Sequence, residues 1–305
     1  MFEPTLEALA AARAATGDRY REVAPRVHDR LDTDARERWD ALLREIAAAG
    51  WHTWEAADAC LDCSEAILDE VGAVALVRFS EIGRGLCQYS HEPARAWFEL
   101  IEALIAEGRS GHLDAMETSV AAVSARFGQA SALICDFLQT AGLVASRHAP
   151  QGMSPWHELV ADMVRSDRAH LASLLTHSTA MPGTDWAEVK QATDASVYTT
   201  LAYLSRLEAL EAVFGPAVVS ALARVVERFA DEGITPFLDA LLEHCAEFSP
   251  SVVITLLEYV GRMPALGVGL TLIENAPRLP MDRPQLVALW IDGGLKETGE
   301  VALQA

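Results

Sequence analysis

The sequence predicts an all-α protein built as a helical repeat, and three observations lead to this prediction. Apolar residues recur at three- and four-residue spacing, and no segment sustains the alternating pattern of a strand. Leucine, alanine, arginine and glutamate, which favour helices, dominate the composition. One segment also returns several times along the chain. We therefore expect little or no sheet.

The returning segment starts with a large apolar residue and reaches a turn residue eleven positions later. Its copies begin at Trp39, Trp97, Trp156 and Leu222, and a looser copy begins at Trp290. The anchors thus return at intervals of roughly 60 residues, which predicts units of several helices whose anchors fill equivalent positions in the core. The fold class is then a HEAT- or armadillo-like solenoid of about 13–15 helices, because stacked units bury one another's apolar stripes.

The helices follow in order. Thr33, after Asp32, opens one helix, and Gly50 is placed to close it in a left-handed cap. The next helix runs from Trp54 to Val71 and ends at Gly72. Further helices are predicted over 74–89, 92–107, 112–127, 130–146, 154–178, 184–213, 216–232, 235–247, 250–262, 265–275 and 283–298.

Proline and glycine support these boundaries. Ser154 with Pro155, and Ser249 with Pro250, fit an N-cap followed by proline in the first turn. Two glycine pairs inside helices, at 83 and 85 and at 267 and 269, predict close helix packing. The remaining tryptophans lie near helix ends and are expected to be partly exposed: Trp51, Trp54 and Trp186.

We expect a single continuous helical-repeat domain over residues 1–305. No long Ser/Pro/Gly-rich or single-charge stretch offers a place to divide the chain. Joints are expected near 148–155 and 178–185, which are too short to be linkers between independent domains.

The charge limits the partners. With 44 acidic and 24 basic residues, the net charge of −20 disfavours nucleic acid and anionic membrane surfaces. No window reaches the roughly 18 apolar residues of a membrane span, so no membrane insertion is expected. The five cysteines lie in apolar, helix-like runs and are expected to be reduced core thiols, as in a cytoplasmic protein.

Few residues suggest a metal or cofactor site. Cys60 and Cys63 have the C-x-x-C spacing of zinc and redox sites, but no second ligand pair accompanies them. His170 and His177, with Asp167, could share one helix face. We favour core thiols and hydrogen-bonded histidines. No phosphate-binding, dinucleotide, hydrolase or zincin motif occurs, so we expect no catalytic residue and no cofactor.

The C-terminal stretch, from Ser249 to Ala305, carries a resemblance. Its features are the apolar helix ending at Met263-Pro264, the proline-marked segment 277–284, and Trp290 shortly before Gly293-Gly294. This stretch resembles the helical region of bacterial adaptors that carry a von Willebrand A domain, such as the nitric-oxide-reductase activation protein and the large subunit of a Rubisco activase. The resemblance implies a protein partner, a MoxR-type AAA+ ATPase, and a target complex that the ATPase remodels.

The chain departs from that family because the Asp-x-Ser-x-Ser metal-adhesion motif is absent, so no adhesion-site residue is carried over. The chain is then either a fragment of a longer adaptor or a relative without the A domain. The leading hypothesis is a non-catalytic helical scaffold that binds protein. Two alternatives stay open: a helical metal- or cofactor-binding protein or enzyme, and a free-standing solenoid whose acidic groove binds peptides.

Overall fold

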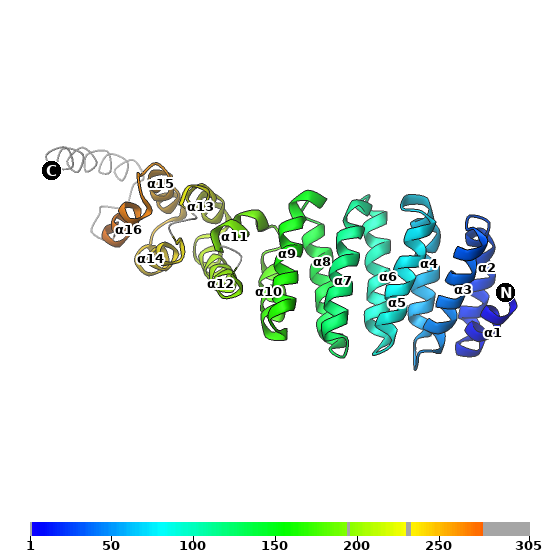
Figure 1. Cartoon of the computed structure of the whole chain (residues 1–305). Coiled ribbons are helices and arrows are strands. Elements are labelled where there is room, and N and C mark those ends of the chain that lie inside the picture. The colour runs from blue at the N-terminus through cyan, green and yellow to red at the C-terminus, as the bar shows by residue number, and fades with distance from the viewer. Residues whose placement is uncertain (1, 194–195, 230–232, 277–305) are drawn as a thin grey trace. The chain divides into compact units, whose positions relative to one another are not determined.

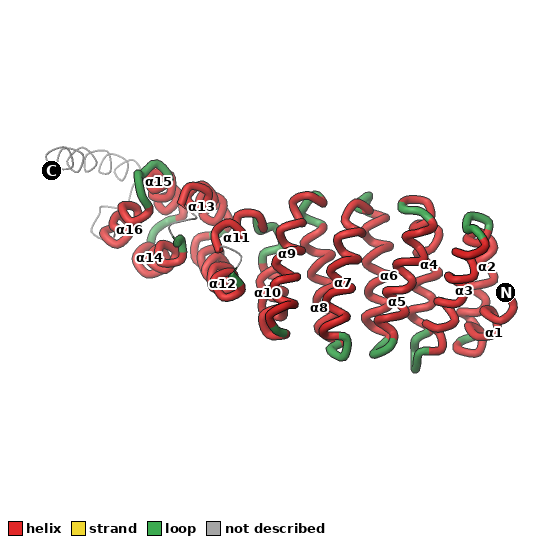
Figure 2. Tube along the Cα trace, viewed as in Figure 1, coloured by secondary structure: helices red, strands yellow, loops and turns green. Residues whose placement is uncertain are grey.

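The fold was obtained from a computed structural model, which describes residues 2–193, 196–229 and 233–276. Within these ranges the chain forms 16 α-helices and one short 3₁₀ helix, and no strand (Figure 2). The prediction of an all-α, solenoid-like fold is confirmed, although the described residues contain more α-helices than the roughly 13–15 expected. The chain divides into two compact units, residues 1–183 and 184–305, which are described separately.

The first unit contains ten α-helices, each joined to the next by a short turn (Figure 1). Their bounds are α1 Phe2–Ala12, α2 Ala14–His28, α3 Thr33–Ala48, α4 Trp54–Glu70, α5 Ala73–Cys87, α6 His91–Ala106, η1 Ser110–His112, α7 Leu113–Phe127, α8 Ser131–Ala145, α9 Pro150–Ser166 and α10 Arg168–Ala180. In the second unit they are α11 Trp186–Thr193, α12 Val197–Phe214, α13 Pro216–Phe229, α14 Thr235–Cys245, α15 Pro250–Val260 and α16 Leu266–Asn275.

The first unit is a stack of helix pairs in two layers. Each helix from α1 to α8 packs on the next helix but one, and most of these helices also pack on the next helix. The odd-numbered helices α1 to α9 therefore form one layer, and the even-numbered helices α2 to α10 form the other. Successive odd helices α3, α5 and α7 begin at residues 33, 73 and 113, so the repeat unit is a helix pair of about 40 residues.

The predicted anchors are buried, but they do not occupy one position of this repeat. Trp39, Trp97 and Trp156 are fully buried, and Leu222 of the second unit is nearly so. Trp39 and Trp156 lie on α3 and α9, whereas Trp97 lies on α6 of the other layer. The interval from one tryptophan anchor to the next covers three helices, or one and a half pairs, so the anchors alternate between layers. Trp290 and the expected helix 283–298 lie outside the described residues.

Two predicted helices are in fact four. The prediction over 154–178 is wrong because Asp167 separates α9 from α10: its backbone is extended and its carboxylate accepts a hydrogen bond from the His170 amide, which caps α10. The prediction over 184–213 is wrong because it spans both α11 and α12. Ser154 is no N-cap either, since α9 already begins at Pro150 and Pro155 lies inside it.

Gly50 does not form a left-handed cap. Among the described residues with positive φ the nearest is His52, at 61°, and Gly50 is not one of them. The Thr53 hydroxyl lies within hydrogen-bonding distance of the carbonyl groups of Ala47 and Gly50, at 3.1 and 2.8 Å. The side chain across the turn thus satisfies carbonyl groups that a glycine cap would otherwise satisfy.

Two further predictions have mixed outcomes. A Cβ added at Gly83 would overlap the Phe98 ring, and one added at Gly269 would lie 2.6 Å from Val260, so close packing is confirmed at these two glycines. Gly85 and Gly267 face open space.

Trp51 is exposed and Trp54 half-buried, as expected, but Trp186 is fully buried.

Candidate functional site

The two cysteines of the C-x-x-C motif lie in the core of the first unit. Cys60 and Cys63 are fully buried on α4. The Cys60 sulfur lies 3.6 Å from Ser80 Oγ, and the Cys63 thiol donates to the Cys60 carbonyl at 3.4 Å. Burial raises the pKa of Cys60 to about 11 and raises the pKa of Cys63 well above its usual value. Both side chains are therefore protonated thiols at neutral pH and weak nucleophiles.

The histidines of the alternative site lie elsewhere. His170 Nδ1 is 2.7 Å from Ser166 Oγ and 3.1 Å from Asp167 Oδ2, so its ring is held at the start of α10. His177 lies two turns further along the same helix. The principal neighbours of α10 are α8 and α9, whereas those of α4 are α2, α3, α5 and α6, so the structure does not bring the cysteines and histidines together. Among the described residues, no three His, Cys, Asp or Glu side chains are grouped as metal ligands.

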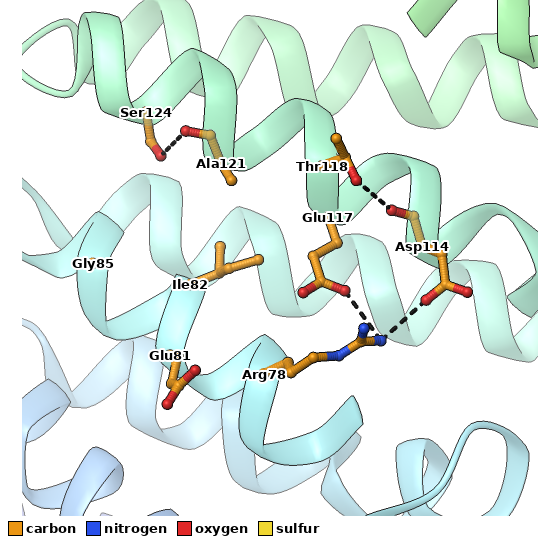
Figure 3. A pocket seen from close by; sticks show the side chains of 9 residues that line it. All are labelled: Arg78, Glu81, Ile82, Gly85, Asp114, Glu117, Thr118, Ala121 and Ser124. Carbon is orange, nitrogen blue, oxygen red and sulfur yellow. Dashed lines mark hydrogen bonds and ion pairs between the residues drawn. The ribbon is translucent and has the colours of Figure 1, made fainter. Parts of the chain in front are cut away.

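A charged groove lies between α5 and α7, in the odd-numbered layer. Its volume is about 720 Å³ and it is open to solvent. Arg78 crosses it and pairs with Asp114 at 3.0 Å and with Glu117 at 3.2 Å (Figure 3). Glu81 also lines the groove, and burial raises the pKa of Glu117. The groove thus holds three carboxylates and one guanidinium.

Grooves of the same kind lie between other neighbouring helices. One of about 640 Å³ lies between α6 and α8 and is lined by Arg95 together with Glu92, Glu99 and Asp136. Another, of about 270 Å³, lies between α3 and α5 and is lined by acidic residues, two arginines and small apolar side chains: Asp32, Asp34, Glu81, Arg38, Arg78, Ala35, Ala73, Val74 and Val77. In each groove the acidic residues outnumber the arginines.

These grooves were not predicted residue by residue. Arginine–carboxylate pairs join successive helices of the same layer and are separated by about one helix pair: Arg78–Asp114 and Arg38–Glu81 lie in these grooves, and Arg95–Glu55 joins α6 to α4. The corresponding signal in the sequence is an arginine and a carboxylate separated by 36 to 43 residues. This separation is shorter than the interval of roughly 60 residues between the tryptophan anchors, so the anchors do not reveal these charged pairs.

An aromatic cluster occupies the turn between α3 and α4. Trp51 is 89% exposed. Its ring centroid lies 5.5 Å from that of His52, and His52 lies 6.1 Å from Trp54. The Arg13 guanidinium stands over the Trp54 ring, 3.9 Å from its centroid. A pocket of about 300 Å³ is formed by this turn together with Ala12 and Ala47. We call Arg13, Trp51, His52 and Trp54 the Trp51 corner.

Several ionisable groups are shifted but lie between packed helices. Burial lowers the pKa of His157 to about 4, with a smaller contribution from His112, and its Nδ1 lies 2.8 Å from Ser119 Oγ. In the second unit, burial raises the pKa of Glu188 to about 7, although the Tyr203 hydroxyl donates to it at 2.9 Å. Neither group lines a groove described above. Both positions are consistent with structural contacts between helices.

A buried acid lies between α2 and α3. Asp40 is fully buried, accepts a hydrogen bond from the Tyr20 hydroxyl at 2.7 Å, and lies 3.0 Å from His28 Nε2. Tyr20 stacks on Trp39, with ring centroids 6.2 Å apart. Neither Asp40 nor its neighbours Tyr20, His28 and Trp39 line a groove described above. We therefore interpret this cluster as a polar link between α2 and α3.

Comparisons of the chain with protein-family models, with curated proteins and with solved structures find no match. In the described part of the chain, none of the helices combines the length and the apolar character needed to cross a membrane.

Proposed function

We propose that this chain is a non-catalytic helical-repeat scaffold that binds protein through the acidic grooves between successive helices of the same layer. The observation that carries the proposal is the groove between α5 and α7, which is open to solvent and charged. Small-molecule sites are usually enclosed and mostly apolar, with few polar groups. An open groove lined by carboxylates suits a partner surface better than a substrate.

The repetition of the grooves also supports this proposal. Stacked helix pairs expose an extended surface, and proteins of this architecture commonly use it to bind other proteins. The excess of acidic residues predicts a partner with a basic contact surface, because complementary charge speeds encounter and selects orientation. The buried, protonated thiols of Cys60 and Cys63 favour this function over thiol chemistry.

The resemblance of the C-terminal stretch names the first partner to test. We propose a MoxR-type AAA+ ATPase from the same organism, which the chain would link to a target complex. Purified full-length chain is expected to bind the purified ATPase and to change its rate of ATP hydrolysis. If neither binding nor a rate change occurs, the adaptor form of the proposal is wrong. Binding of basic peptides alone would then favour a free-standing peptide-binding solenoid.

The role of the groove is tested by removing two of its charges. The double variant Asp114→Asn, Glu117→Gln is expected to bind a basic partner about fivefold more weakly, with a smaller dependence on salt. Its matched control is Asp18→Asn, Glu22→Gln on α2, which removes two exposed carboxylates that also pair with arginine. Equal losses in both variants would show that only overall charge matters and would contradict the groove as the contact surface.

A further inference from the structure

The Trp51 corner presents a large apolar ring to solvent from a constrained turn. Trp51 is almost completely exposed, whereas Trp39, Trp97, Trp156 and Trp186 are fully buried. His52, the next residue, has a backbone φ of 61°, a conformation that residues other than glycine rarely adopt. The Thr53 hydroxyl bonds to carbonyl groups on the far side of the turn and holds this geometry. The turn is therefore both strained and fixed.

The strained residue, His52, is exposed and does not belong to the core. Residues in sparsely populated backbone regions persist where the surrounding structure imposes them, and they cluster at binding sites. Here the strained residue displays Trp51 rather than burying it. Tryptophan is also one of the residue types that dominate binding energy in protein interfaces. The geometry therefore suits contact with another molecule.

A contact within the Trp51 corner indicates which kind of chemical group its rings can bind. The face of Trp54 already carries the guanidinium of Arg13 at 3.9 Å, a cation–π contact within the chain. Trp51 lines the same pocket as Trp54. Glu55, at the edge of the corner, lies 3.9 Å from His52 Nδ1 and 3.8 Å from His91 Nε2. The chain as a whole carries a net charge of −20, so its field attracts cations.

We propose that the Trp51 corner binds an arginine- or lysine-bearing segment of a protein partner, with one cationic side chain stacked on the Trp51 indole. Trp51 would then have the same relation to the partner's cation as Trp54 has to Arg13. The inference rests on the proposed protein-binding function and places one of its contacts at the α3–α4 turn, apart from the groove between α5 and α7.

The test uses the full-length chain and a nine-residue arginine peptide, with the citrulline peptide of equal length as the uncharged control. Binding is followed by the indole N–H signals in NMR spectra, where the Trp51 signal is identified by its loss in Trp51→Ala. The arginine peptide is expected to shift the Trp51 signal, and Trp51→Ala to bind it at least about fivefold more weakly, while Trp51→Phe retains part of the affinity. An unchanged thermal unfolding curve checks that Trp51→Ala is folded.

Three results would overturn the inference. The first is equal affinity of Trp51→Ala and wild type for the arginine peptide. The second is equally strong binding of the citrulline peptide, which would indicate an apolar contact. The third is a shift of the Trp51 signal with protein concentration alone, which would indicate that a second copy of the chain binds there. The groove variant Asp114→Asn, Glu117→Gln separates this inference from the proposed function. If only the groove variant loses binding, the scaffold proposal stands and the Trp51 corner does not; if the wild type binds no basic protein or peptide, both fail.

Discussion

At the scale of single residues, His157 shows how burial ties stability to pH. Its side chain lies between α7 and α9, where Ser119 lies beside one ring nitrogen and burial lowers its pKa to about 4. The unfolded chain, with an ordinary histidine pKa of about 6.5, takes up a proton at higher pH than the folded chain does. Stability is therefore lost as pH falls from about 7 towards 4, and it is independent of this group above that range.

We predict that the free energy of unfolding falls by about 2 kcal/mol more in the wild type than in His157→Gln between pH 7.5 and 4.5. Glutamine can bond to Ser119 but does not titrate in this range. Urea unfolding at the two pH values measures the difference. Parallel losses in the two proteins would show that the His157 ring is protonated as easily in the folded chain as in the unfolded chain.

Residue burial was predicted where the helical pattern alone determines it. Trp39, Trp97 and Trp156 each stand in the apolar stripe of a long helix, and all three are buried. Trp186 begins a helix of eight residues, and from its position a partly exposed ring was expected. It is buried because α11 packs on α12 and α13, and such a contact between helices cannot be read from local sequence.

At the scale of elements, the paired glycines of α5 separate packing from helix propensity. Gly83 faces the ring of Phe98 on α6, whereas Gly85 faces open space. We predict that Gly83→Ala lowers the free energy of unfolding by about 1–3 kcal/mol, because an added methyl group forces the two helices apart. Gly85→Ala is expected to raise it by about 0.5–1 kcal/mol, because alanine loses less backbone entropy in a helix.

Chemical denaturation of the two variants measures both changes, and each serves as the control for the other. The same substitution at two positions of one helix should then change the free energy of unfolding in opposite directions. If both variants are stabilised, α5 and α6 can accommodate a methyl group at Gly83 despite the close contact with the Phe98 ring, and the prediction is wrong.

Several helix boundaries were predictable from glycine or proline, although Pro155 lies inside α9. Gly72 and Pro250, for example, stand at boundaries that the structure confirms. The returning segment that begins at Trp156 reaches its turn residue at Asp167, but the helix prediction over 154–178 passed through this position. An aspartate can cap a helix or lie exposed in the middle of one, and local sequence does not distinguish these states. The grooves were missed for a related reason: their walls belong to helices brought together only by stacking.

At the scale of the whole molecule, the division after Gly183 predicts independent folding of the first unit. The principal contacts of α1 to α10 are with one another. We predict that a fragment of residues 1–183 is helical by circular dichroism and unfolds cooperatively on heating. Helix-pair stacks suit such a fragment, since each pair depends mainly on its neighbours.

A fragment of residues 1–166 is the control, because it lacks α10, which covers α8 and α9. It is expected to unfold at a lower temperature than the 1–183 fragment. Failure of the longer fragment to give a cooperative transition, under conditions where the full chain does, would contradict the independence of the first unit.

The domain prediction shows what the sequence leaves open at this scale. Both 148–155 and 178–185 contain proline and glycine, and both were expected to be joints. The first is largely taken up by the start of α9, whereas the second contains the division between the two compact units. Composition is nearly the same in both segments, so only the packing of helices on either side distinguishes them.

The helix-pair stack also determines how such a chain can change in length. Deleting residues 73–112 would remove α5, α6 and η1 and join Gly72 to Leu113, so every later helix of the first unit would keep its layer. Deleting one helix alone would move the later helices of the first unit to the opposite layer and turn their apolar stripes away from the core. Insertions and deletions among descendants of this sequence are therefore expected to comprise whole pairs of helices.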